Sequence, residues 1–208
     1  MEEKKKYIIE NVGRLYFKKG IRAVTMDDVA AEFGISKKTL YQYFSDKKGL
    51  VTQVIEFFIE ESNKTFKQLD DKNAVDSILL IRKHVAFIYK FYNNGIDKDL
   101  KKYYPELYKK INEIKRERIF TSTIDNLKLG MTQGMYRTDL DPYLIAKLQV
   151  GRMLFTMNPD YGIFEEYEVN SLAFFDSMMD YHMNAICNEK GIKYYKNQLN
   201  KVQYEETN

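Results

Sequence analysis

Apolar residues recur at helical spacing along most of the chain. In residues 4–19, Ile8, Val12, Leu15 and Tyr16 follow i, i+4, i+7 and i+8 spacing, which places them on one face of a helix. Similar patterns predict longer and shorter helices over residues 47–69, 74–93, 97–103, 106–129, 142–157 and 165–188. Residues 191–208 are more polar and predict a short helix or a frayed tail. No segment alternates as a strand would, so the pattern predicts an all-α protein.

Between the first two long helices, residues 25–48 predict two short helices joined by a tight turn. Thr25 with Asp28 three residues later has the pattern of a helix-capping pair. Gly34 can adopt the positive φ that often ends a helix, because glycine has no Cβ to clash. Ser36 then caps a second short helix that runs from Lys37 to about Phe44. This arrangement is typical of a helix-turn-helix motif.

The outward face of the second short helix has the composition of a DNA-contacting surface. It carries lysine, threonine, glutamine and tyrosine, with no acidic residue of its own. Lysines at a helix N-terminus oppose the helix dipole, so an anion such as DNA phosphate is expected there. Thr39 and Gln42 are types that read base edges. The predicted DNA-binding residues are Thr25, Ser36, Lys37, Lys38, Thr39, Tyr41, Gln42, Tyr43 and Lys47.

A motif in and after the turn resembles the DNA-binding signature of TetR-family transcriptional regulators. It consists of Gly34-Ile35-Ser36, Thr39-Leu40-Tyr41-Gln42-Tyr43-Phe44 and Lys47, with Gly20, Thr25 and Val29-Ala30 also fitting. The resemblance covers residues 5–55 and implies two domains. A three-helix helix-turn-helix domain would occupy residues 1–48, and a helical effector-binding and dimerisation domain residues 49–208. The resemblance also implies a homodimeric repressor that binds a palindromic operator and is released by a small effector.

Charge is distributed in keeping with this division. The net charge of the chain is only +3, but residues 1–50 contain 11 Lys and Arg against 7 Asp and Glu, and the remainder contains 22 against 23. The basic excess therefore lies in the part with the predicted DNA-binding motif. Cys187 is the only cysteine, which excludes an intrachain disulfide and suits a reducing cytoplasm. We expect neither a signal peptide nor a membrane-spanning helix, and no membrane partner.

Catalytic and metal-binding patterns are missing from the sequence. His84 and His182 are far apart in the chain, and none of the common nucleotide-binding, hydrolase or zinc motifs occurs. The histidines are better explained as packing or interface residues. We therefore expect no enzyme activity, no metal site and no cofactor.

The middle helices are rich in aromatic rings and methionine. Core packing explains any one of these residues, but together they fit a plastic apolar pocket. The TetR resemblance implies that this region binds a small effector, which we expect to be apolar or aromatic. The predicted pocket residues are His84, Phe87, Phe91, Tyr104, Tyr108, Phe120, Met153 and Met157.

Broad apolar faces occur on the last two long helices before the polar tail. They could form the core of the protomer, but the resemblance implies a four-helix interface with a second copy. DNA geometry also favours a dimer, because two recognition helices must read half-sites about 34–36 Å apart. The predicted interface residues are Leu144, Leu148, Gly151, Phe155, Leu172, Phe175, Met179 and Met183.

Two alternatives to a ligand-responsive repressor remain open at this stage. The first is a DNA-binding regulator with a fully packed second domain and no small-molecule effector. The second is an α-helical enzyme or lipid carrier in which the helix-turn-helix plays no part, which the missing catalytic pattern disfavours. The operator sequence, the effector and the target genes are not encoded in any pattern described above.

Overall fold

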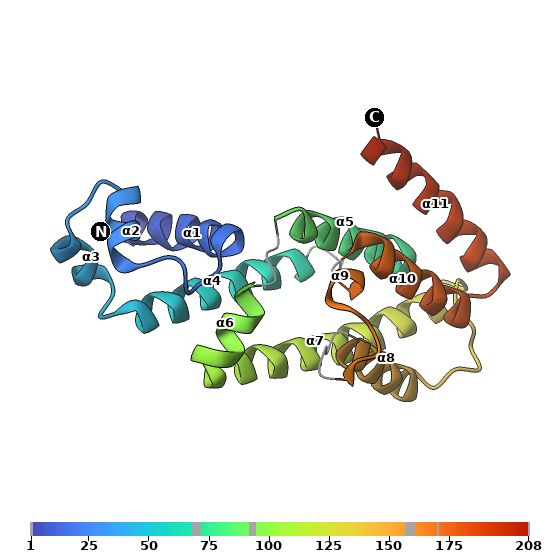
Figure 1. Ribbon diagram of the computed structural model, residues 1–208. Coiled ribbons are helices and arrows are strands. Elements are labelled where there is room, and N and C mark those ends of the chain that lie inside the picture. Colours follow the sequence, from blue (N-terminus) through green and yellow to red (C-terminus); the bar gives the residue numbers. More distant parts are fainter. Residues whose placement is uncertain (1, 68–71, 92–94, 157–160, 170, 208) are drawn as a thin grey trace. The chain divides into compact units, whose positions relative to one another are not determined.

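Every regular element of the described residues is an α-helix, as the sequence predicted (Figure 1). The computed structural model describes residues 2–67, 72–91, 95–156, 161–169 and 171–207. Tyr136 and Cys187 additionally form an isolated antiparallel bridge. The helices are α1 (Glu2–Lys19), α2 (Met26–Glu32), α3 (Lys37–Tyr43), α4 (Lys47–Lys67), α5 (Ala74–Phe91), α6 (Gly95–Tyr103), α7 (Pro105–Thr132), α8 (Pro142–Thr156), α9 (Glu166–Val169), α10 (Leu172–Ile186) and α11 (Glu189–Thr207).

The helix boundaries differ from expectation in the last third of the chain. The single helix expected over residues 165–188 is divided into α9 and α10. Ser171 lies between them with extended backbone, and its hydroxyl accepts a hydrogen bond from the Phe174 N–H at 3.2 Å, so a new helix begins there.

The polar C-terminal segment is a long helix rather than a short or frayed one. α11 runs over Glu189–Thr207. Tyr195 and Val202 are buried and lie seven residues apart, and Leu199 between them packs against the same buried cluster as Tyr195. Residues at this spacing lie on one face of a helix. Burial of the stripe formed by Tyr195, Leu199 and Val202 therefore stabilises α11 despite its polar composition.

Packing divides the chain into two compact units. The first contains residues 1–68 and 91–111, and the second contains residues 69–90 and 112–208. This division does not coincide with the expected domain boundary at residue 48. The first unit also takes in α4 and α6, because Val51 and Val54 of α4, together with Ile96 and Leu100 of α6, are buried in the same core as α1.

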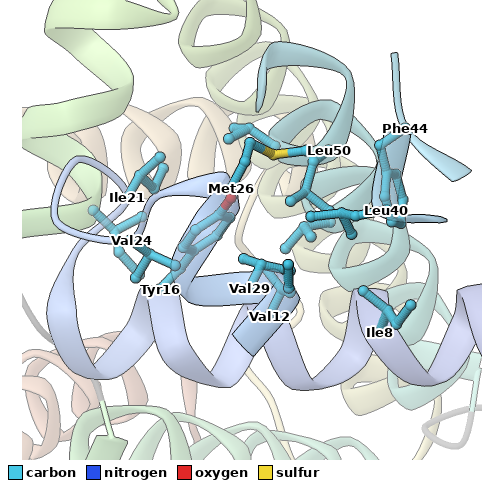
Figure 2. Close-up of a cluster of buried hydrophobic side chains, with 14 of the residues drawn as sticks. Ile8, Val12, Tyr16, Ile21, Val24, Met26, Val29, Leu40, Phe44 and Leu50 are labelled. Carbon is cyan, nitrogen blue, oxygen red and sulfur yellow. The ribbon is translucent and has the colours of Figure 1, made fainter. Parts of the chain in front are cut away.

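The core of the first unit holds the helix-turn-helix against α1. Figure 2 shows side chains from α1, α2, α3 and α4 converging on one apolar cluster, including Ile8, Val12, Val29 and Leu40. Gly13 lets α1 approach α4 closely, because a Cβ there would lie 2.0 Å from the Phe58 ring. A pair of short helices cannot bury a core alone, so α1 and α4 supply the apolar surface that α2 and α3 need.

The core of the second unit is formed by α5, the C-terminal half of α7, α10 and α11. Its buried members include Leu127, Tyr136, Met183 and Tyr195. The Tyr136 hydroxyl donates to Asn126 Oδ1 at 3.0 Å, and Asn126 Nδ2 donates to the Ala74 carbonyl at 2.7 Å. These bonds satisfy polar groups that would otherwise be costly to bury, and they tie the start of α5 to α7.

Candidate DNA-binding surface

The first helix of the motif begins at the capping pair that the sequence indicated. The Thr25 hydroxyl accepts from the Asp28 N–H at 3.1 Å, and the Asp28 carboxylate accepts from the Thr25 N–H at 2.8 Å. These hydrogen bonds hold the pKa of the Asp28 carboxyl below its usual value. Gly34 follows with a φ of +59°, in the left-handed region that turns the chain toward α3.

The second helix is oriented by one buried side chain and one cap. The Ser36 hydroxyl accepts from the Thr39 N–H at 3.1 Å and lies 2.8 Å from the Thr39 hydroxyl. Leu40 is completely buried beneath α3, and Phe44 is buried just beyond its end (Figure 2). Because Leu40 fixes which face of α3 points inward, the opposite face is left toward solvent.

The exposed face of α3 presents several of the side chains that the sequence assigned to DNA. Lys38, Tyr41 and Gln42 are exposed. Tyr43 is only half-buried and packs against the core of the first unit, with its ring centroid 6.3 Å from that of Phe44. The Thr39 hydroxyl already shares a hydrogen bond with the Ser36 hydroxyl. Among these residues, Lys38, Tyr41 and Gln42 have the fullest access to a DNA groove.

Lys37 has an acidic partner that the sequence reasoning did not include. Its ammonium lies 2.8 Å from Oδ1 and 3.0 Å from Oδ2 of Asp27 in the first turn of α2. The carboxylate raises the pKa of Lys37. The anion expected at this helix N-terminus is therefore already supplied within the protein for Lys37, by Asp27. The partner is ten residues earlier, and only the turn between α2 and α3 brings the two side chains together.

Lys47, at the start of α4, forms a hydrogen bond within the protein. Its ammonium donates to the Arg22 carbonyl at 3.3 Å, and partial burial lowers its pKa. The Arg22 N–H in turn donates to the Asp99 carboxylate of α6 at 2.6 Å. Lys47 therefore helps to hold the loop between α1 and α2, besides any contact with phosphate. Sequence reasoning missed Asp99, because no local pattern relates α6 to this loop.

The sequence profile described as "Bacterial regulatory proteins, tetR family" matches residues 8–54, which span α1 to the first part of α4. This match includes every residue that was predicted to contact DNA. The chain contains a DNA-binding domain of the TetR family. It is therefore a DNA-binding transcriptional regulator of the helix-turn-helix type, and the sequence-based prediction of the family is confirmed.

Relatives extend the likeness over the rest of the chain. The HTH-type transcriptional regulator YvaF of Bacillus subtilis (strain 168) is 25% identical over 186 residues, which cover 87% of this chain and 94% of YvaF. A TetR-family regulator from Cytophaga hutchinsonii superposes with a TM-score of 0.63 at 16% identity, over 90% of this chain and 96% of that one. A gamma-butyrolactone receptor (ArpA-like protein) superposes with a TM-score of 0.60 at 16% identity, over 97% of both chains. At these identities the two structures establish the fold alone.

The predicted effector residues are spread over both packing units. Tyr104 and Tyr108 pack against the core of the first unit. His84, Phe120 and Met153 belong to the second unit and are half-buried. The side chains of Phe87 and Phe91, and all of Met157, lie outside the described residues. Surface hollows of about 560 and 430 Å³ are lined by other side chains. The effector pocket therefore stays a prediction.

The predicted dimer residues of α8 form an exposed apolar stripe. Leu144, Leu148 and Phe155 are 53%, 59% and 46% exposed. Gly151 lies on the same helix face, and a Cβ built there would meet no atom within 4 Å. Leucine and phenylalanine side chains that project together from one helix form a surface suited to a protein partner. The exposure of these α8 residues is compatible with the predicted dimer interface, which stays a prediction.

The α10 half of the prediction needs correction. Phe175, Met179 and Met183 are buried inside the protomer, and Met183 lies in the core of the second unit. Leu172 is half-buried. The sequence revealed that α10 has an apolar face but not what covers it. In the structure the protomer itself covers most of that face.

A polar cluster lies beside the α8 stripe. The Arg152 guanidinium donates to the Met178 carbonyl at 2.8 Å and to Gln149 Oε1 at 2.5 Å, and it lies over the Tyr181 ring. His182 of α10 is buried nearby. Burial and the Arg152 charge lower the pKa of His182 to about 4. The imidazole is therefore neutral in the folded protein at neutral pH.

We expect acid to destabilise the second unit through His182. Its folded pKa of about 4 is below the ordinary value of 6.5, so between these values the unfolded chain takes up a proton that the folded chain does not. Stability should be complete above pH 6.5 and fall progressively toward pH 4. Urea unfolding across this range checks it, with His182→Gln expected to flatten the pH dependence. His84→Gln gives the comparison and should flatten it less, because His84 is only half-buried and its pKa is lowered by that partial burial. An equal slope in wild type and His182→Gln would contradict the assignment.

Within the part of the chain that the structure describes, no group of three or more His, Cys, Asp or Glu side chains could hold a metal ion. None of the described helices is long and apolar enough to cross a membrane.

Proposed function

We propose that the protein is a cytoplasmic homodimeric repressor that binds a palindromic operator through α3 and is released by a small effector. The orientation of α3 carries this proposal. Leu40 is buried under the helix, and Lys38, Tyr41 and Gln42 project from its exposed face within the domain that matches the TetR family. A helix-turn-helix reads the major groove with this kind of surface.

Gln42 is expected to carry base specificity. A glutamine amide can bond an adenine edge in two places, and a good bidentate pair contributes about 1–3 kcal/mol of discrimination. Gln42→Ala should therefore relax the preference at one position in each half-site. Selection of bound sequences from random duplex DNA would reveal this change.

Lys38→Gln is the matched control for that experiment. Lys38 is exposed on the same helix but is a phosphate-contact type, which positions the protein without reading sequence. It should lower the affinity for all duplexes and leave the selected motif unchanged. An unchanged motif from Gln42→Ala would instead make Gln42 a phosphate-contacting or packing residue.

Support for a homodimer comes from the α8 stripe and from DNA geometry. An exposed apolar stripe on one helix is self-complementary across a two-fold axis, since each copy offers the same surface. A palindromic operator requires that symmetry, because its half-sites are related by a two-fold axis.

Two observations support an effector. A gamma-butyrolactone receptor shares the fold over 97% of both chains. The aromatic and methionine residues of the middle helices suit an apolar ligand. A second candidate is a regulator without an effector, which the packing of Tyr104 and Tyr108 against the core of the first unit favours. Release of operator DNA by a panel of small apolar compounds would separate the two candidates.

A further inference from the structure

The Asp27–Lys37 pair joins the two helices of the DNA-binding motif. Both carboxylate oxygens of Asp27 lie within 3.0 Å of the Lys37 ammonium. The side chains are 70% and 53% exposed, so the pair does not fill any core. Lys37 is the first residue of α3, and Asp27 is in the first turn of α2. The pair therefore lies on the helix that is proposed to face DNA, where a phosphate can compete with Asp27 for the Lys37 ammonium.

The two acidic residues at the start of α2 have different roles. The Asp28 carboxylate accepts from the Thr25 N–H and hydroxyl, and so completes the helix cap. Asp27 does not take part in that cap, and its carboxylate bonds the Lys37 ammonium. A carboxylate in the first turn is also favoured by the helix dipole. Removing Asp27 would therefore leave the cap of α2 intact, which makes its electrostatic role separable from folding.

Two anions compete for the Lys37 ammonium, namely the Asp27 carboxylate and a DNA phosphate. In the free protein it bonds Asp27, and on DNA it could bond a backbone phosphate only by giving up or sharing that contact. Asp27 itself would repel the phosphate. Lys38, the next residue, makes no ion pair in the part of the chain that the structure describes. Its charge is thus available to phosphate in a way that the Lys37 charge is not.

We propose that Asp27 is an intramolecular competitor for DNA phosphate, which holds Lys37 in the free protein and weakens binding to duplexes of any sequence. The proposal depends on α3 facing DNA, as proposed above. Because phosphate contacts carry no sequence information, Asp27 lowers non-specific binding without altering which operator is preferred. Binding to the operator then depends more on base contacts and less on phosphate contacts.

Asp27→Asn tests the proposal directly. It removes the charge while keeping the size of the side chain, and it leaves the Thr25–Asp28 cap of α2 in place. We expect affinity for a non-operator duplex to rise about threefold per half-site, or about tenfold for a dimer, because exposed ion pairs are weak. The salt dependence should become steeper, since Lys37 would then release counterions from DNA without exchanging one anion for another. Fluorescence anisotropy at several salt concentrations measures both quantities.

Two further variants complete the design. Glu32→Gln changes the net charge equally on the same helix, at an exposed position outside the Asp27–Lys37 pair. It should give a much smaller gain. In the Lys37→Gln background, Asp27→Asn should give no more than the small gain of Glu32→Gln, because Asp27 then has no lysine to hold and only its general charge is removed. Circular dichroism melts confirm that each variant is folded.

The outcomes separate this proposal from the proposed function. Equal gains from Asp27→Asn and Glu32→Gln would reduce the effect to net charge and overturn the proposal. A loss of affinity in Asp27→Asn would show that Asp27 positions Lys37 for phosphate rather than competing for it, and would also overturn it. If Lys37→Gln and Gln42→Ala both bound DNA like the wild type, α3 would not face DNA, and the proposed function itself would fail.

Discussion

Leu148→Glu is expected to convert the protein into a monomer and to abolish operator binding at the same time. Leu148 is 59% exposed in the middle of the α8 stripe, with Leu144 and Phe155 on the same face. In the proposed dimer a carboxylate there would be buried against apolar side chains without a partner, which costs several kcal/mol. We expect the dissociation constant of the dimer to rise more than about 100-fold, since each 1.4 kcal/mol is a factor of ten. Sedimentation velocity at micromolar concentration and operator titration measure the two effects.

The experiment has a matched control in the same packing unit. Asn197→Glu adds the same charge at an exposed position of α11. It should leave both the mass and the operator affinity unchanged. A Leu148→Glu protein that remained dimeric would show that the α8 stripe is not the interface, and a monomeric wild type would refute the homodimer. Phe175, by contrast, is unsuitable for this test, because a charge at a buried position would unfold the protomer.

Gly130→Ala is expected to destabilise the second unit by about 3 kcal/mol. A Cβ at Gly130 of α7 would lie 2.1 Å from the Tyr136 ring. Tyr136 is buried, and its hydroxyl is held by Asn126, so the ring has little room to move. In a solvent-exposed helix the same substitution usually stabilises by up to about 1 kcal/mol, so the sign of the effect reports packing rather than helix propensity. Urea unfolding followed by circular dichroism gives the free energy.

Gly151→Ala provides the comparison, because a Cβ there would meet nothing within 4 Å. Since Gly151 lies in the proposed interface, both glycine variants should be made in the Leu148→Glu background, which removes any effect of dimerisation. We expect Gly151→Ala to be neutral or slightly stabilising. If Gly130→Ala were equally harmless, the Tyr136 ring would have to shift at little cost, and the close packing of α7 on this ring would not limit stability.

The sequence by itself determined the elements whose signals are local. The capping of α2 by Thr25 and Asp28, the positive φ at Gly34 and the cap at Ser36 all act within three residues or one turn of the chain. Residue type and spacing therefore suffice to predict them, and with Leu40 they also determine which side of α3 faces outward. The all-α class followed from helical periodicity, which needs no knowledge of partners.

Only the tertiary structure decided which surface covers each apolar face and which charges meet. α8 and α10 both have apolar faces in the sequence, yet Leu148 is exposed and Met183 is fully buried. Lys37 faces Asp27 because a turn folds α2 against α3, at a separation of ten residues that no local pattern records. The physical reason is that hydrophobic burial and ion pairing are non-directional and depend on distance in space. Periodicity reveals that a helix face must be covered, and only packing determines what covers it.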